Sequence, residues 1–249
     1  MTSRLVFSVP GEGATTSLTS MTSASRVAPE DPLAPLAQIN VPVDTLIVAG
    51  WAGRDRDAAE HHIAELAALG VRRPSSTPCF YRLAPALLSQ DDAIDVVGET
   101  STGEAECVLV RCGDEWFVSV GSDHTDREVE AYGVTVSKQV CAKPVARQAW
   151  RFGEVAGHWD RLVLRSWVSA NGERRLYQEG TVAGLLSPHE LMTRLGPHGL
   201  PSGAVMFCGT LAAIGGVAGG DVFEIELHDP VLGRTIRHRY ATRALAIAD

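Results

Sequence analysis

The chain has 249 residues, of which 45% are hydrophobic and 21% charged, a composition typical of a globular protein with one large domain and a sizeable core. A formal net charge of −8 argues against a nucleic-acid-binding protein, because phosphate contacts need clustered Lys and Arg side chains. The five cysteines are scattered without a Cys-x-x-Cys pair, which indicates reduced thiols and argues against a disulfide scaffold or a structural zinc site.

The N-terminal part is predicted to contain little regular structure. Residues 3–9 have the pattern of a strand, and residues 11–38 are rich in Gly, Ser, Thr, Ala and Pro, which favours an irregular loop. We therefore assign residues 1–46 to an N-terminal strand and flexible loop region, and residues 47–249 to the main domain. The first apolar run is too short for a signal-peptide core, and no segment reaches the roughly 18 apolar residues of a membrane span. We expect a soluble, cytoplasmic protein.

Three helices are predicted along the main domain. The first covers residues 56–69 and ends at Gly70, with apolar side chains in one narrow stripe at helical spacing. The second covers residues 126–137, and the third covers residues 188–195 with Ser187 as its N-cap.

Short β-strands dominate the rest of the chain. The Asn171-Gly172 pair is a strong signal for a hairpin turn. Many strands with few helices predict a β-rich α+β domain. The expected strands cover residues 45–48, 80–83, 93–97, 104–111, 115–120, 162–168, 176–179, 204–207, 222–227 and 235–240.

Three acidic residues form the most informative pattern. Glu104 and Glu106 stand two positions apart in a predicted strand, so both point to one face about 7 Å apart. Such a pair repels unless a cation lies between, and Mg²⁺ or Mn²⁺ prefers oxygen ligands. Asp123 follows the next predicted strand and could supply a third oxygen. The alternatives are a solvated strand edge for the two glutamates and a helix cap for Asp123.

Other polar residues could complete an active site. Arg127 and Lys143 could bind a substrate carboxylate or stabilise an oxyanion, or else form surface ion pairs with nearby glutamates. On the first predicted helix, His62 and Glu65 are neighbours at i, i+3, so the carboxylate can orient the imidazole to activate water; His61 could do the same. An exposed polar helix face would explain these three residues equally well.

A late turn, Gly209-Thr210, follows a predicted strand. It offers a backbone N–H and a hydroxyl to an anionic group, although a plain loop has the same sequence pattern.

In this order, the segments resemble the fumarylacetoacetate hydrolase superfamily from about Ile47 to the C-terminus. The segment 54–70 with His62-x-x-Glu65 is similar to that family's lid helix, which carries a His–Glu dyad. The three acids fall, in order, where its metal ligands fall. Further matches are Arg127, Lys143, the Asn171-Gly172-Glu173 hairpin and the Gly209-Thr210 turn.

The resemblance implies a mixed β-roll or barrel with a small lid segment, and residues 47–249 as a catalytic domain. It implies Mg²⁺ or Mn²⁺ held by Glu104, Glu106 and Asp123, and a 2-oxo acid or acylpyruvate substrate cleaved at a C–C bond through a metal-stabilised enolate. His62 and Glu65 would activate water. The other implied contacts with the substrate are Lys143, Arg127, Gly209 and Thr210, and the implied assembly is a homodimer.

Two alternatives remain open on the same resemblance. A decarboxylase, tautomerase or hydratase would use the same metal site without water attack, and a non-catalytic small-molecule-binding protein would use the fold alone. The chain departs from the family pattern at Ser122, His124, Asp126 and Leu211, where the family usually has other residues. These departures indicate a divergent branch with an altered pocket, so the resemblance does not name the substrate.

Overall fold

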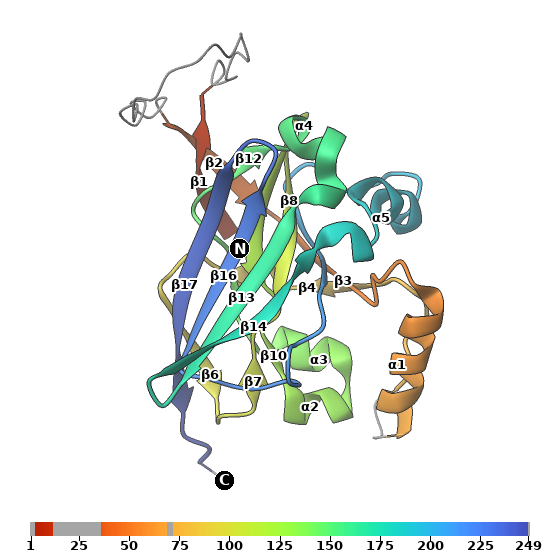
Figure 1. Ribbon diagram of the computed structural model, residues 1–249, viewed down its shortest axis with the longest axis vertical. Helices are drawn as coiled ribbons and strands as arrows, with labels where there is room; N and C mark the ends of the chain where they lie inside the picture. Colours follow the sequence, from red (N-terminus) through yellow and green to blue (C-terminus); the bar gives the residue numbers. More distant parts are fainter. Residues whose placement is uncertain (1–2, 12–35, 69–71, 249) are drawn as a thin grey trace, which may run out of the picture.

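Two β-sheets packed face to face form the body of the protein (Figure 1). The computed structural model describes residues 3–11, 36–68 and 72–248. The larger sheet has six strands in the order β12 (Trp150–Arg151), β9 (Glu115–Ser122), β8 (Ala105–Cys112), β15 (Ala204–Thr210), β3 (Thr45–Gly50) and β4 (Cys79–Leu83). The second has five, in the order β14 (Glu173–Thr181), β13 (Val163–Ala170), β16 (Val222–Asp229), β17 (Arg234–Leu245) and β6 (Ala93–Val97).

Smaller strand pairs and short helices surround the two sheets. α2 and α3 lie beside β10 at one end of the sheets, and α1 stands to the side (Figure 1). The pairs are β1 (Ser3–Pro10) with β2 (Leu36–Val43), β10 (Thr125–Asp126) with β7 (Ser101–Thr102), and β11 (Lys143–Pro144) with β5 (Leu88–Ser89). The helices are α1 (Arg56–Ala68), α2 (Arg127–Tyr132), α3 (Val134–Gln139), α4 (Phe152–Val155) and α5 (Pro188–Leu195), with 3₁₀ turns at Pro85–Leu87, Ala156–Arg161 and Val182–Gly184.

The six-stranded sheet is buried on both faces, which explains its run of apolar residues. In β8, Cys107 and Leu109 point to a core shared with the five-stranded sheet, and Val108 and Val110 point to a second core. The second core includes side chains of β1 and β2, such as Phe7. A strand covered on both sides needs apolar residues at successive positions, as residues 107–110 provide.

The prediction of a β-rich α+β fold is confirmed, with one correction. Among the described residues the sheets remain separate and do not close into a barrel. The structure has strands at all of the predicted positions and a capping box at Ser187 that begins α5. No helix among these residues is long and apolar enough to span a membrane.

Two predicted segments differ from the structure. The helix expected over residues 126–137 is two helices, because the chain is extended at Gly133 and its N–H closes α2 on the carbonyl of Val129 at 3.0 Å. The loop predicted over residues 11–38 falls mostly outside the described residues, and its last three positions belong to β2. The division of the chain at residue 46 stays a prediction.

Candidate metal centre

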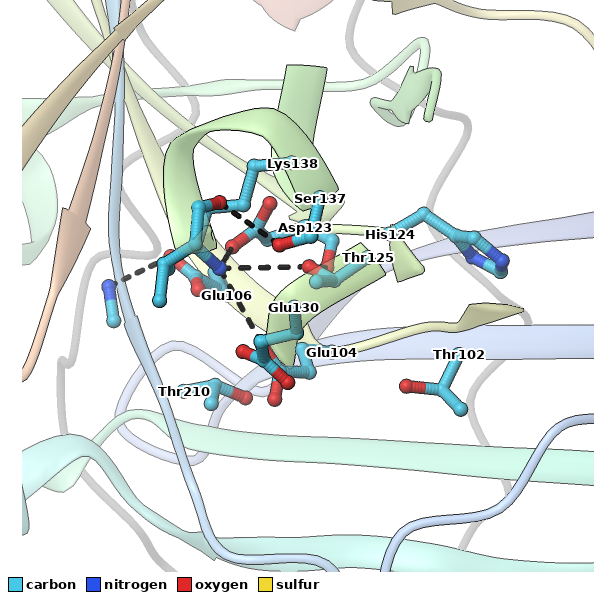
Figure 2. Close-up of polar contacts among 12 residues, drawn as sticks. Thr102, Glu104, Glu106, Asp123, His124, Thr125, Glu130, Ser137, Lys138 and Thr210 are labelled. Atoms are coloured by element: carbon cyan, nitrogen blue, oxygen red, sulfur yellow. Dashed lines mark hydrogen bonds and ion pairs between the residues drawn. The ribbon is translucent and has the colours of Figure 1, made fainter. Parts of the chain in front are cut away.

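The β8–β9 hairpin brings three carboxylates together. Glu104 directly precedes β8, Glu106 lies within it, and Asp123 directly follows β9. The antiparallel register pairs Ala105 with Ser122, and the backbone N–H of Asp123 donates to the carbonyl of Glu104 at 2.9 Å. One ligand atom from each of the three carboxylates lies within 4.8 Å of the others. We call Glu104, Glu106 and Asp123 the carboxylate cage (Figure 2).

Glu106 is a buried carboxylate whose ionised form depends on nearby positive charge. It is only 2% exposed, and the backbone N–H of Gly209 donates to its Oε2 at 2.7 Å. Burial, reinforced by the charge of Asp123, raises the pKa of Glu106 well above its usual range. Positive charge in the cage therefore favours the ionised form of this side chain.

Asp123 has an oxygen available for a ligand. Its Oδ2 accepts a hydrogen bond from Lys138, whereas Oδ1 has no hydrogen-bond donor among the described residues and lies 3.4 Å from the Nζ of Lys143. Burial opposes ionisation, but the charges of Lys138 and Lys143 hold the pKa of Asp123 below its ordinary value. Three clustered carboxylates with a free buried oxygen fit a hard divalent cation such as Mg²⁺ or Mn²⁺.

Lys143 is fully buried beneath the cage. Its Nζ donates to the carbonyl oxygens of His124 at 2.6 Å, Lys138 at 2.5 Å and Cys141 at 3.0 Å. An ammonium has three N–H donors, so these three bonds use all of them. Burial lowers the pKa of Lys143. The structure thus places this predicted catalytic residue where it holds the backbone around Asp123.

Lys138 is a site residue that the sequence analysis did not single out. It lies near the end of α3, and its Nζ contacts Asp123, lies 3.4 Å from the hydroxyl of Thr125 and 4.0 Å from Oε2 of Glu104 (Figure 2). Burial alone would lower its pKa, but the surrounding carboxylates raise the pKa of Lys138 above its usual value, so the ammonium stays charged. A signal was present in the sequence: the chain has only two lysines, Lys138 and Lys143.

Arg127 is held by three partners at the first turn of α2. It donates to Thr102 at 2.7 Å, Glu104 at 2.7 Å and Glu130 at 3.0 Å. These bonds use one N–H on each of its three nitrogens, so N–H groups on both terminal nitrogens remain for a ligand. Arg127 therefore orients one carboxylate of the cage and still lines the cleft above it.

Thr210 is also tied to the protein. Its hydroxyl donates to the carbonyl of Ala105 at 2.9 Å and accepts from the side-chain amide of Gln178 at 2.7 Å. A hydroxyl has one proton, so Thr210 in this arrangement can only accept a further hydrogen bond. Gln178, which the sequence analysis missed, is buried and joins β14 to β8 through its bond from the N–H of Ala105 at 2.9 Å.

A cleft with a volume of about 1180 Å³ lies over the cage. Its walls come from the end of β3 and the residues after it (49–53), from α2 and α3, and from residues 209–219, which begin with Gly209 and Thr210 at the end of β15. His62 and Glu65 lie on the described backbone of α1, but their side chains are outside the described residues. The predicted dyad therefore stays a prediction.

His124, next to Asp123, belongs to the protein core. Its ring nitrogens lie 3.0 Å from the hydroxyl of Ser101 and 3.2 Å from that of Tyr240, and the hydroxyl of Tyr240 donates to Ser122 at 2.7 Å. Burial, with the nearby positive charges, lowers the pKa of His124 to about 3, so the ring is neutral. Two departures from the family pattern, Ser122 and His124, thus form one buried network behind the cage.

Comparisons with known proteins agree with this architecture. A family model described as "Protein of unknown function (DUF2848)" matches residues 49–240. A fumarylacetoacetate hydrolase family protein from Yersinia pestis CO92 has a similar structure, with a TM-score of 0.57, 18% identity, and coverage of 83% of this chain and 96% of its own. A fumarylacetoacetate hydrolase family protein from yeast has a TM-score of 0.56 and 17% identity, with coverage of 81% of this chain and 94% of its own.

A further similar structure is 2-keto-3-deoxy-D-arabinonate dehydratase complexed with magnesium and 2,5-dioxopentanoate. Its TM-score is 0.56 at 16% identity, over 81% of this chain and 74% of the dehydratase. No curated protein matches the sequence. At these identities the comparisons show a shared fold, which confirms the resemblance at that level.

Proposed function

This chain belongs to the protein family of unknown function DUF2848 and has the fold of fumarylacetoacetate hydrolase family proteins, and from that premise we propose that it is a divalent-metal-dependent enzyme acting on 2-oxo acids. The observation that carries the proposal is the carboxylate cage at the floor of a large cleft. The structural similarity to a dehydratase complexed with magnesium supports it. The metal is Mg²⁺ or Mn²⁺, since three carboxylates are ligands that both cations accept.

In the hydrolytic form of the proposal, the enzyme cleaves a C–C bond of an acylpyruvate-type substrate. The bound cation would polarise the keto oxygen of the substrate and stabilise negative charge that develops there. Arg127 holds Glu104 in place and directs its remaining N–H groups at substrate oxygens in the cleft. The proposal assigns water activation to His62, oriented by Glu65.

Lys143 and the Gly209-Thr210 turn have supporting roles in this scheme. Lys143 fixes the backbone that carries Asp123, and Gly209 positions Glu106 through its N–H. The hydroxyl of Thr210, already donating to Ala105, is limited to accepting a hydrogen bond from a protonated or hydroxylated substrate group. A homodimer, which the family resemblance implies, and a cytoplasmic location, which the pattern of cysteines favours, are part of the same proposal.

A second candidate is a lyase or isomerase on the same metal site: a decarboxylase, a tautomerase or a hydratase. The similarity to 2-keto-3-deoxy-D-arabinonate dehydratase favours this class, because the elimination of water needs proton transfer without an attacking water. Assays of an acylpyruvate, oxaloacetate and a 2-keto-3-deoxy sugar acid, each with Mg²⁺ or Mn²⁺, distinguish the two classes. A His62→Ala variant that loses one activity and keeps another assigns the dyad. Tight binding of oxalate without turnover of any of these compounds would instead indicate a non-catalytic binding protein.

The metal site is tested by Asp123→Asn, which keeps the shape of the side chain beside Lys138 and Lys143. We expect Mn²⁺ binding, measured by calorimetry, and metal-dependent turnover to fall about a hundredfold or more, because one anionic ligand is lost. The matched control is Asp126→Asn, the same chemical change three residues away at the N-cap of α2, where an amide oxygen also serves as a cap. Equal metal binding by the two variants would contradict the assignment.

A further inference from the structure

The distribution of lysine in this chain is unusual. The chain has twenty arginines but only two lysines, and both lysines are buried on either side of Asp123. Lysine differs from arginine in carrying a compact charge on a flexible stem, with donors that can turn toward several acceptors. The only two compact cationic side chains of this chain therefore both lie beside Asp123.

The two ammonium groups are held in different ways. Lys143 donates to three backbone carbonyls and is fully buried, so it is locked in place. Lys138 has its main bond to the carboxylate of Asp123, with a long contact to Thr125 at 3.4 Å, and it lines the cleft. Of the two, only Lys138 can leave its position without breaking several bonds to the backbone.

The ammonium of Lys138 lies where it conflicts with a metal ion. It contacts Asp123 and is 4.0 Å from Glu104, and one oxygen from each carboxylate of the cage lies within 4.8 Å of the others. A divalent cation bonded at about 2.0–2.6 Å to the Asp123 oxygen that Lys138 contacts would lie within about 5 Å of Nζ. Two positive charges so close in a buried site repel strongly.

The cleft also offers the Lys138 side chain a second position. The cleft opens beside it, and its Nζ already lies 5.9 Å from the centre of the Tyr81 ring, whose face attracts a cation. The four-carbon stem allows the ammonium to swing from Asp123 toward this ring or toward an anionic ligand in the cleft.

Resting on the proposed metal site, we propose that Lys138 is an internal counter-ion of the carboxylate cage, which competes with the divalent cation and is displaced into the cleft when the metal binds. Without metal, its ammonium balances the cage and stabilises the fold. With metal, the ammonium is freed and adds a positive charge at the position where an anionic substrate enters. Lys138 thus sets the affinity of the cage for metal.

Calorimetric titration of Mn²⁺ into the 249-residue protein and two variants tests the competition. Lys138→Met removes the charge at similar volume, and we expect it to bind Mn²⁺ about tenfold more tightly or better than the unmodified protein. It should also melt at a lower temperature without metal and regain the difference with metal. Lys138→Arg keeps the charge, so its affinity should stay within a few-fold of the unmodified protein.

A second measurement uses the unmodified protein and holds even if a variant does not fold. The protein is treated with an amine-acetylating ester, without and with Mg²⁺, and acetylation of each lysine is followed by mass spectrometry. We expect Lys138 to react several-fold faster with Mg²⁺, and Lys143, locked by three carbonyls, to serve as the internal control. Labelling of Lys138 that is unchanged or slower with metal overturns the displacement.

The outcomes separate the two proposals. If neither the unmodified protein nor Lys138→Met binds Mn²⁺ or Mg²⁺, the proposed metal site is wrong. The proposed competition between Lys138 and the metal is then wrong as well. If both bind with equal affinity, or the variant binds more weakly, the metal site stands and the role of Lys138 is overturned. Tighter binding by Lys138→Met but not by Lys138→Arg, together with metal-dependent labelling, supports the counter-ion.

Discussion

At the scale of single residues, Gly209 shows how backbone geometry serves the cage. Its φ of 97° is in a region that side chains with a Cβ rarely adopt, and an added Cβ would lie 2.7 Å from the Cβ of Ala52. This conformation directs its N–H to Glu106 at 2.7 Å. The glycine is therefore needed for the position of one carboxylate.

We predict that Gly209→Ala lowers stability by about 1–3 kcal/mol through backbone strain, with the contact to Ala52 adding to that cost. The shifted N–H should weaken Mn²⁺ binding about tenfold or more, as is usual when a group that orients a metal ligand is lost. Thermal unfolding and calorimetry measure the two effects. The control is Gly113→Ala, where φ is 61° but an added Cβ meets no atom within 4 Å. Equal losses of stability in the two variants, with metal affinity unchanged in Gly209→Ala, would refute the role of Gly209.

The carboxylates of the cage could be predicted because they are close in sequence and the strand period of two places Glu104 and Glu106 on one face. A hairpin then brings Asp123 opposite them. Lys138 could not be placed in this way, because its position depends on the break at Gly133 that turns α3 back toward the hairpin. Gln178 reaches the site from the other sheet, and such contacts across layers leave no local pattern in a sequence.

At the scale of elements, the strands of five or more residues were predicted well except for β2, and the two-residue strands were not predicted. A strand such as β6, with the predicted bounds 93–97, shows a clear alternation of buried and exposed positions. The pairs β7–β10 and β5–β11 have two residues per strand, too few for any periodicity. The break between α2 and α3 escaped prediction because one glycine within a helical pattern is often tolerated.

The segment that leads into α1 is tied to the main body by Arg54. Its guanidinium donates to both carboxylate oxygens of Asp160, at 2.8 and 2.9 Å, and to the carbonyl of Ala183 at 3.0 Å. These bonds connect the root of α1 to two 3₁₀ turns beside the five-stranded sheet. This tie therefore fixes the start of the helix on which the predicted dyad, His62 and Glu65, is located in the sequence.

We predict that Arg54→Ala speeds amide hydrogen exchange in α1 while exchange in β8 and β9 stays the same, since a local contact is lost and the core is untouched. Global stability should fall by about 1 kcal/mol or less, because the pair is partly exposed. Arg174→Ala is the matched control, because Arg174 forms a similar two-bond pair with Glu224 on the five-stranded sheet, away from α1. Unchanged exchange in α1 of Arg54→Ala would show that other contacts hold the helix.

At the scale of the whole molecule, a buried carboxylate joins the two layers. Asp229, at the end of β16, accepts from His158 at 2.9 Å and from the backbone N–H groups of Val231 at 3.0 Å and Leu232 at 3.2 Å. His158 belongs to the 3₁₀ segment that follows α4, and α4 packs on β9 and β12 of the six-stranded sheet. The turn after β16 of the five-stranded sheet is thereby fixed to the 3₁₀ segment that follows α4 on the six-stranded sheet.

This arrangement predicts an acid-sensitive fold. Burial alone would raise the pKa of Asp229, but its hydrogen bonds from His158 and the backbone outweigh burial and hold the pKa below its ordinary value. A carboxylate with a lowered folded-state pKa adds stability above its unfolded pKa and loses that contribution as the pH falls through the folded value. Asp229→Asn should therefore reduce stability at pH 7 by about 1–3 kcal/mol and flatten the fall of the melting temperature between about pH 5 and pH 3.

The control is Asp95→Asn, in an exposed pair with Arg243, which should leave the pH profile of the melting temperature unchanged. An equally steep acid limb in Asp229→Asn would mean that other carboxylates, such as Glu226 between Arg165 and Arg237, dominate the acid unfolding of the protein.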